Sequence, residues 1–231
     1  MCTVIIEVPE DKNQNIRFLA IRDENPERPW DPVGPWWPDN PDVIGVHDRE
    51  AGGAWLAASD KKQKLAVILN RIEFLPVPPE GLASRGGIVL EAIAGKQVPE
   101  APGTQSFNLV EIESHQATIT SYNGKKVIRE KIKPGIHMVA HDNMDDFRTP
   151  RIKLWLPEFQ KLAGLPEDEW QQAWLDLLEK TTKLGPEDNK AIIRDNRVYG
   201  IPTLSLMYVI GKNSESRITL NSKVFDKPGQ L

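Results

Sequence analysis

The chain has 231 residues, 39% hydrophobic and 27% charged, a balance typical of a globular protein with a substantial core. Its formal net charge of −4 argues against nucleic acid as a partner, and its single cysteine excludes internal disulfides and paired-cysteine metal sites. Because it shows neither a signal peptide nor an apolar run of about 20 residues, we expect a cytoplasmic, bacterial-type soluble protein without a membrane span. Its length and the absence of a long linker predict one domain, residues 1–231.

The single cysteine is Cys2, which directly follows Met1. Removal of Met1 would leave Cys2 with a thiol, whose usual pKa is about 8.5, and a free α-amine, whose usual pKa is about 7.7–8.0. The neutral amine can take the thiol proton, so the two groups form a nucleophile and its base. Residues 2–8 predict a strand and residues 16–21 its hairpin partner, which makes Cys2 the start of a rigid element. The alternative is a cysteine without a role.

Arg22, Asp23 and Glu24 end the second strand, where an antiparallel hairpin brings them close to Cys2. An arginine there would favour the thiolate, and a carboxylate would hold the protonated α-amine. Since successive strand residues point to opposite faces, Arg22 and Asp23 face the thiol together only if the strand has already ended. The alternative is a solvated charge cluster at a turn.

Residues 25–41 are dense in proline and tryptophan, which predicts an ordered loop without helix or central strand. Its tryptophans, Trp36 among them, either cover an edge of the core or line a pocket. Residues 54–59 and 65–70 predict two further strands, the second of which ends at Asn70. The amide of Asn70 is a candidate oxyanion donor, and a simple strand end is the alternative.

The remaining pattern combines strands with three helices, and this order predicts an α+β fold in which helices pack outside antiparallel sheets. Ser84 is the expected cap of the first helix. The stripe from Trp170 to Leu178 is expected to be core packing. The predicted helices span residues 84–94, 150–163 and 166–181, and the predicted strands span residues 107–112, 116–122, 127–132, 136–141, 203–210 and 217–225.

The histidines show no zinc-type spacing, and His137 and His141 lie in a segment that reads as extended. The acidic stretch 141–146 lacks the glycine and the distal glutamate of a calcium loop. Neither a glycine-rich phosphate loop nor a Gly-x-Ser-x-Gly elbow is present. We therefore expect no metal site and no resident cofactor.

A series of short blocks, in order along nearly the whole chain, resembles one known family. The blocks are Met1-Cys2, Ala20–Glu24, Arg28-Pro29, Asp48–Leu56, Leu69–Arg71, Ser84–Gly86, Phe107–Leu109, Gly135–His137 and Tyr199-Gly200. Together they resemble the NRDE family, which includes the transport-and-Golgi-organisation-two proteins. The most specific block is Glu-Ala-Gly-Gly-x-Trp-Leu, residues 50–56.

This resemblance implies an N-terminal-nucleophile hydrolase-like fold, a four-layer αββα sandwich of two antiparallel sheets. By similarity to the cysteine amidases of that superfamily, it implies a hydrolase of C–N amide or thioester bonds in a small molecule. Cys2 would be the nucleophile, with Arg22, Asp23 and Asn70 completing the catalytic site. The candidates for ligand binding are Trp36, Trp55, Arg71 and His141.

Three positions depart from the family pattern. Ile21 replaces the leading asparagine of the motif, Ala140-His141 stands where the family commonly has Ser-Asn, and Ile201-Pro202 stands where it often has Thr-Arg. Any oxyanion role at the second position falls to His141. Since family members are also linked to haem mobilisation and to acyl-CoA or lipid handling, the alternative function is a carrier that binds haem or an acyl-CoA without cleaving it.

Overall fold

The computed structural model describes residues 2–11, 13–214 and 217–231. Contacts divide these residues into two compact units, each built on one antiparallel sheet. The first unit holds the described residues up to Arg28, together with Pro134–Lys212 and Thr219–Leu231. The second unit holds Pro29–Lys133 and Asn213–Ile218.

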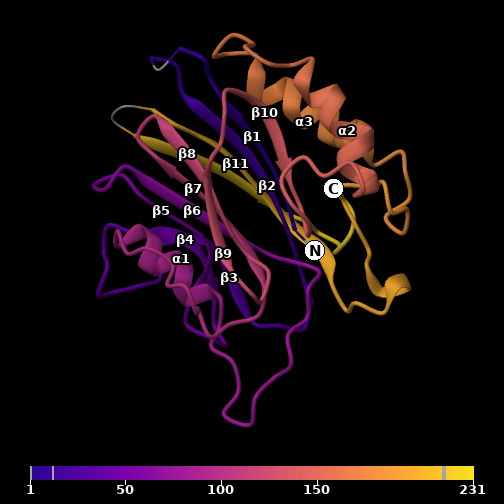
Figure 1. Ribbon diagram of the computed structural model, residues 1–231. Helices are drawn as coiled ribbons and strands as arrows, with labels where there is room; N and C mark the ends of the chain where they lie inside the picture. The colour runs from indigo at the N-terminus through magenta and orange to yellow at the C-terminus, as the bar shows by residue number, and fades with distance from the viewer. Residues whose placement is uncertain (1, 12, 215–216) are drawn as a thin grey trace. The chain divides into compact units, whose positions relative to one another are not determined.

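The sheet of the first unit contains both predicted strands near the start of the chain, joined as a hairpin (Figure 1). Its strands follow the order β10-β1-β2-β11-β12. Every residue of β1 is buried, as expected for a short β-branched strand with both faces covered. The strands are β1 (Thr3–Val8), β2 (Ile16–Glu24), β10 (Gly135–Val139), β11 (Leu204–Asn213) and β12 (Ile218–Val224).

Two helices, α2 (Pro150–Gln160) and α3 (Trp170–Thr181), complete the first unit and run side by side (Figure 1). Helix α2 packs on β10, and the predicted apolar stripe of α3 is buried in the same core. Trp174 lies at its centre, fully buried, with Trp170 meeting it edge to face. The expectation of core packing for this stripe is confirmed.

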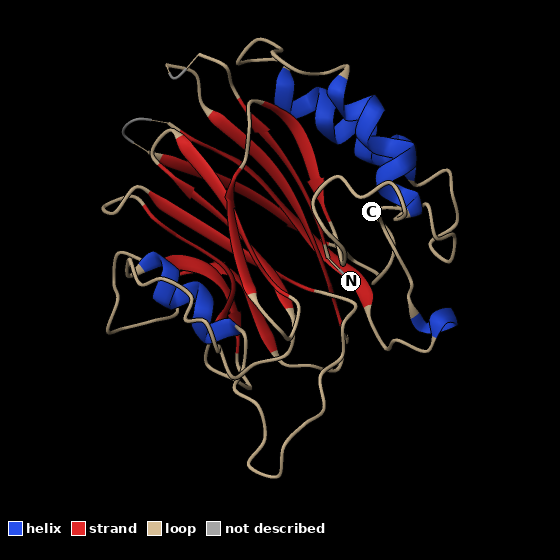
Figure 2. Ribbon diagram, viewed as in Figure 1, coloured by secondary structure: helices blue, strands red, loops and turns tan. Residues whose placement is uncertain are grey.

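The second unit is a continuous meander in which each strand pairs with its neighbours in sequence, with one helix, α1 (Gly86–Ile93), packed on β5 and β6 (Figure 2). Its strand order is β3-β4-β5-β6-β7-β8-β9. The strands are β3 (Trp30–Gly34), β4 (Ile44–Asp48), β5 (Ala54–Ser59), β6 (Lys64–Asn70), β7 (Phe107–Glu113), β8 (Gln116–Tyr122) and β9 (Val127–Lys131).

The prediction that residues 25–41 form a loop is wrong in part, because β3 lies within them, although at the edge of the sheet and not in its centre. Proline at position 32 is tolerated because β3 is an edge strand, where a missing N–H breaks no central ladder. The pairing of β3 with β4 is irregular between Asp31 and Gly34, around this proline. Proline content alone therefore does not separate an edge strand from a loop.

The start of α1 also differs from the prediction. Arg85, not Ser84, occupies the N-cap position, and the Ser84 hydroxyl instead accepts a hydrogen bond from the backbone N–H of Gly86 at 3.2 Å. Helix α1 sits tightly on β5, since a Cβ built on Gly53 would lie 2.5 Å from the carbonyl carbon of Gly86. Gly52, with φ of +69°, makes the turn that precedes this approach.

The chain is thus an α+β protein with two antiparallel sheets, as predicted. The stacking of the sheets into four layers and the single-domain organisation stay predictions. In the described ranges, none of the helices is both long and apolar enough to span a membrane.

Candidate functional site

Cys2 lies directly before β1, and its side chain is buried beside the end of β2. Its sulfur accepts a hydrogen bond from the backbone N–H of Asp23 at 3.3 Å, and its thiol donates to the backbone carbonyl of Asp23 at 3.6 Å. The antiparallel register that sets Thr3 opposite Ile21 makes this contact possible. The structure therefore brings together two of the four predicted catalytic residues.

The carboxylate of Asp23 is held inside the first unit by two side chains from the C-terminal part of the chain. The hydroxyl of Ser205 donates to Oδ1 at 2.6 Å, and the amide of Asn196 donates to Oδ2 at 3.2 Å. Arg194 orients both donors, since its backbone N–H binds the Ser205 oxygen at 2.8 Å and its Nε binds Asn196 Oδ1 at 2.8 Å. All four residues are buried, so this is a connected buried polar network.

The sequence analysis did not identify Arg194, Asn196 or Ser205. These residues lie more than a hundred positions after Asp23, and no local periodicity connects them to it. The one usable signal is the step from the apolar run Ala191–Ile193 to Arg194-Asp195-Asn196, which places polar groups at the end of a buried segment.

Arg151, also absent from the predicted site, lies fully buried at the start of α2. Its Nε donates to the hydroxyl of Thr3 at 3.0 Å, and its Nη2 lies 3.5 Å from the Cys2 carbonyl and 3.2 Å from His141 Nδ1. Burial, helped by the positive charge of Arg194, lowers the pKa of Arg151 to about 10. His141, predicted to bind ligand, is thereby linked to Cys2 through Arg151.

The environment of Cys2 favours the protonated thiol. Burial raises the pKa of the Cys2 thiol, and the negative charge of Asp23 raises that pKa further. The positive charge of the chain's amino terminus, and after it the backbone N–H of Asp23 and the positive charge of Arg22, lower the pKa of the thiol, but the net shift is upwards. A reaction at Cys2 therefore needs a base that removes the thiol proton.

Arg22 is buried, and its Nη2 lies 3.5 Å from a carboxylate oxygen of Glu24. Strand β2 continues through Glu24, so Arg22 and Asp23 occupy successive positions of a strand and point to opposite faces. The condition under which both side chains would face the thiol is not met. Both side chains act on Cys2 through their charges, whereas the hydrogen bonds to the sulfur come from the backbone of Asp23.

Asn70, Arg71 and Trp55 belong to the second unit. Asn70 is exposed at the end of β6, so its amide is not enclosed in the core. Arg71 is buried and donates to Asn108 Oδ1 at 2.9 Å and to Glu73 at 2.8 Å. Trp55 is buried, and its indole N–H has no hydrogen-bond partner among the described atoms. The roles assigned to these residues beside Cys2 stay predictions.

Trp36 also lies in the second unit, where it stacks on His47 with a ring separation of 6.3 Å and remains 37% exposed. Trp37 meets the same ring edge to face and is buried. His47 Nδ1 is 3.0 Å from Asp31, which also pairs with Arg49. Trp37 thus covers the core, whereas Trp36 faces outwards, and its role in lining a pocket stays a prediction.

No group of three or more His, Cys, Asp or Glu side chains in the described ranges gathers closely enough to hold a metal ion. Nδ1 of His137 lies 2.6 Å from the carboxylate of Asp145, and Asp145 also accepts a hydrogen bond from the backbone N–H of Met138. The acidic stretch after His141 is thus used to fix the end of β10.

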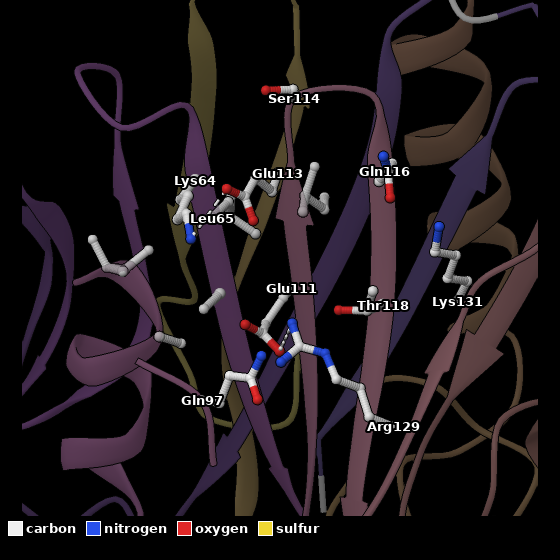
Figure 3. Close-up of a pocket in the computed structure, with 14 residues that line it drawn as sticks. Lys64, Leu65, Gln97, Glu111, Glu113, Ser114, Gln116, Thr118, Arg129 and Lys131 are labelled. Carbon is white, nitrogen blue, oxygen red and sulfur yellow. Dashed lines mark ion pairs between the residues drawn. The ribbon is translucent and has the colours of Figure 1, made fainter. Parts of the chain in front are cut away.

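A groove of about 490 Å³ lies in the second unit beside α1, over the exposed face of β6 to β9 (Figure 3). Ion pairs join Lys64 to Glu113 at 3.2 Å and Arg129 to Glu111 at 3.3 Å within it. None of the predicted site residues lines it. Because these charges pair with one another, they do not indicate which class of ligand the groove would bind. The buried cluster around Cys2 is therefore the stronger candidate for the functional site.

Comparison with known protein families matches residues 1–200 to the family described as Transport and Golgi organisation 2. The matched range includes Cys2, Asp23, Arg151 and Asn196 but ends before Ser205. Comparison with curated proteins gives no significant match.

Proposed function

Because the chain belongs to the Transport and Golgi organisation 2 family, we propose that it is a cysteine hydrolase of the N-terminal-nucleophile type. Its substrate would be a small molecule with a C–N amide or thioester bond. The observation that carries the proposal is the contact of the Cys2 thiol with the backbone N–H and carbonyl of Asp23, a residue whose side-chain carboxylate is fixed separately by Ser205 and Asn196. Covalent catalysis requires a nucleophile in a fixed position, and the hydrogen bonds of Cys2 to the backbone of β2 supply such a position.

In this proposal the two sheets form the middle layers of an αββα sandwich, and residues 1–231 make one domain. The complete burial of both β1 and β5 supports it, since strands buried along their whole length need cover on both faces. Met1, whose removal the mechanism requires, lies outside the described residues.

Once Met1 is removed, the neutral α-amine of Cys2 takes the thiol proton as the sulfur attacks the carbonyl carbon. The C–N bond then breaks, the amine leaves with the proton from the α-ammonium, and the acyl group remains on sulfur as a thioester. Water, deprotonated by the same amine, hydrolyses the thioester and restores the thiol. The α-amine is needed as base because burial raises the pKa of the thiol.

Asp23 would hold the α-ammonium that forms during attack, and Arg22 would stabilise the developing thiolate through its charge. Asn70, together with backbone N–H groups, would donate to the oxyanion of the tetrahedral intermediate. Trp36, Trp55, Arg71 and His141 would contact the rest of the substrate.

A carrier of haem or of an acyl-CoA or other lipid is the second candidate. The same burial that raises the pKa of Cys2 favours it, because a protonated, buried thiol is unreactive without its base. In this case the residues around Cys2 would hold a ligand without cleaving it, and no covalent acyl intermediate would form.

The decisive experiment combines intact mass with an activity screen. We expect the purified protein to lack Met1 and to hydrolyse at least one member of a panel of small amides and thioesters. Cys2→Ala should abolish turnover, whereas Asp226→Asn, an exposed acid in the first unit, should leave turnover unchanged.

Retention of Met1 in the native protein, or equal turnover by wild type and Cys2→Ala, would contradict the hydrolase. Stoichiometric binding of haem or palmitoyl-CoA without turnover, unaffected by Cys2→Ala, would support the carrier instead.

A further inference from the structure

We propose that Arg151 is a positioning residue that fixes Cys2 at the start of β1, and that it does so only while the imidazole of His141 is neutral. The inference rests on the proposed function, in which Cys2 is the nucleophile. It adds a control of that nucleophile by pH.

The first step is that Arg151 contacts the residues at the start of β1. Its Nε binds the Thr3 hydroxyl at 3.0 Å while Nη2 approaches the Cys2 carbonyl at 3.5 Å. A guanidinium is planar, so donors on one rigid fork fix the positions of two successive residues relative to α2. The direction of the Cys2 side chain towards Asp23 depends on the backbone that Arg151 holds.

The second step is that the contact of Arg151 with His141 requires one protonation state of the imidazole. Nη2 of Arg151 lies 3.2 Å from His141 Nδ1, and a guanidinium can only donate. Nδ1 must therefore accept, which leaves the imidazole proton on Nε2, 3.6 Å from a carboxylate oxygen of Asp142. Protonation of Nδ1 would turn two N–H groups and two positive charges towards each other.

The third step is that Arg151 is the side chain that moves when His141 is protonated. On the side of His141 away from Arg151, Nε2 lies 3.6 Å from the carboxylate of Asp142. Arg151 is fully buried and has another guanidinium near it, so it has little tolerance for a third positive charge. Protonated His141 thus displaces Arg151. The titratable and charged groups that face this pair are Asp142 and Asp146 on the loop after β10, Cys2 before β1, Asp23 on β2, and Arg194 before β11.

The test measures how strongly the fold protects the Cys2 thiol. Dithiodipyridine reacts with thiols in acid as well as in neutral solution, and the rate for a model cysteine peptide at each pH corrects for ionisation. In wild type we expect protection at neutral pH that falls about tenfold as the pH drops through about 6.5, where a histidine titrates.

Three variants, one at His141 and two at Arg151, isolate the contributions of the two residues. His141→Asn keeps an acceptor near the place of Nδ1 but does not titrate, so protection should stay high across the range. Arg151→Met should show low protection at every pH, and Arg151→Lys should show an intermediate level. Arg129→Lys, a matched exchange in the groove of the second unit, should behave as wild type.

Protection that is independent of pH in wild type, or that is unchanged in Arg151→Met, would overturn the proposal. Should Arg151→Met fail to fold, the wild-type profile and the two milder variants still decide. The readout needs no substrate, so an inactive protein would refute the proposed hydrolase without touching this result.

Discussion

The Asp23 carboxylate shows how strongly a single buried residue depends on its donors. Both of its oxygens accept hydrogen bonds, from Ser205 at 2.6 Å and from Asn196 at 3.2 Å. Neither donor reaches water, because both residues are buried. The carboxylate is therefore as much a structural acceptor as a candidate catalytic group.

Asp23→Asn should consequently destabilise the fold. The amide turns one N–H group towards a donor and leaves it without an acceptor, which costs about 1–3 kcal/mol. Urea denaturation of wild type and variant measures the difference, and the exposed exchange Asp226→Asn is the control. Equal midpoints for all three proteins would show that the network does not contribute to stability.

Asp31 provides a pH-dependent contribution in the second unit. Hydrogen bonds from Arg49 and then His47 lower the pKa of Asp31 to about 2. The pKa of an aspartate in the unfolded chain is about 3.9, so ionised Asp31 stabilises the fold above that pH. This stabilisation is lost as the pH falls from about 4 to about 2. Asp31→Asn should flatten this part of the pH dependence.

The measurement is the urea midpoint at successive pH values below about 5. Asp39→Asn, an exchange of an exposed acid in the same unit, should retain the wild-type slope. If Asp31→Asn loses stability in acid as steeply as wild type, the ion pairs of Asp31 do not carry the effect.

Among the elements, α1 depends on a backbone contact that admits no side chain. Gly53, directly before β5, approaches Gly86, so a Cβ on Gly53 would lie 2.5 Å from the carbonyl carbon of Gly86. Because the obstacle is backbone, a side chain here must move the helix or the strand.

Gly53→Ala should therefore cost about 1–3 kcal/mol through overpacking. Gly87→Ala is the matched control, since a Cβ there meets nothing within 4 Å and alanine favours a helix over glycine by up to about 1 kcal/mol. Thermal unfolding of both variants checks the pair, and a stable Gly53→Ala protein would contradict the close approach.

At the same scale, most strands were predicted from the sequence, whereas β3 and β4 were not. The hairpin β1–β2 and the apolar stripe of α3 followed directly from periodicity. Strand β3 did not, because its proline resembles a loop until the neighbouring strand shows that it is an edge. Pairing partners, not composition, make it a strand.

Across the whole molecule, the sequence by itself determined the α+β class, the family and the position of Cys2 beside the end of β2. These follow from local patterns of apolar residues and from short blocks of matching residues. The tertiary structure alone decided what surrounds Cys2. Ser205 lies 182 residues from Asp23, and Arg151 lies 148 residues from Thr3. Contacts over such separations are set by how the sheet and helices pack, and no spacing in the sequence records them.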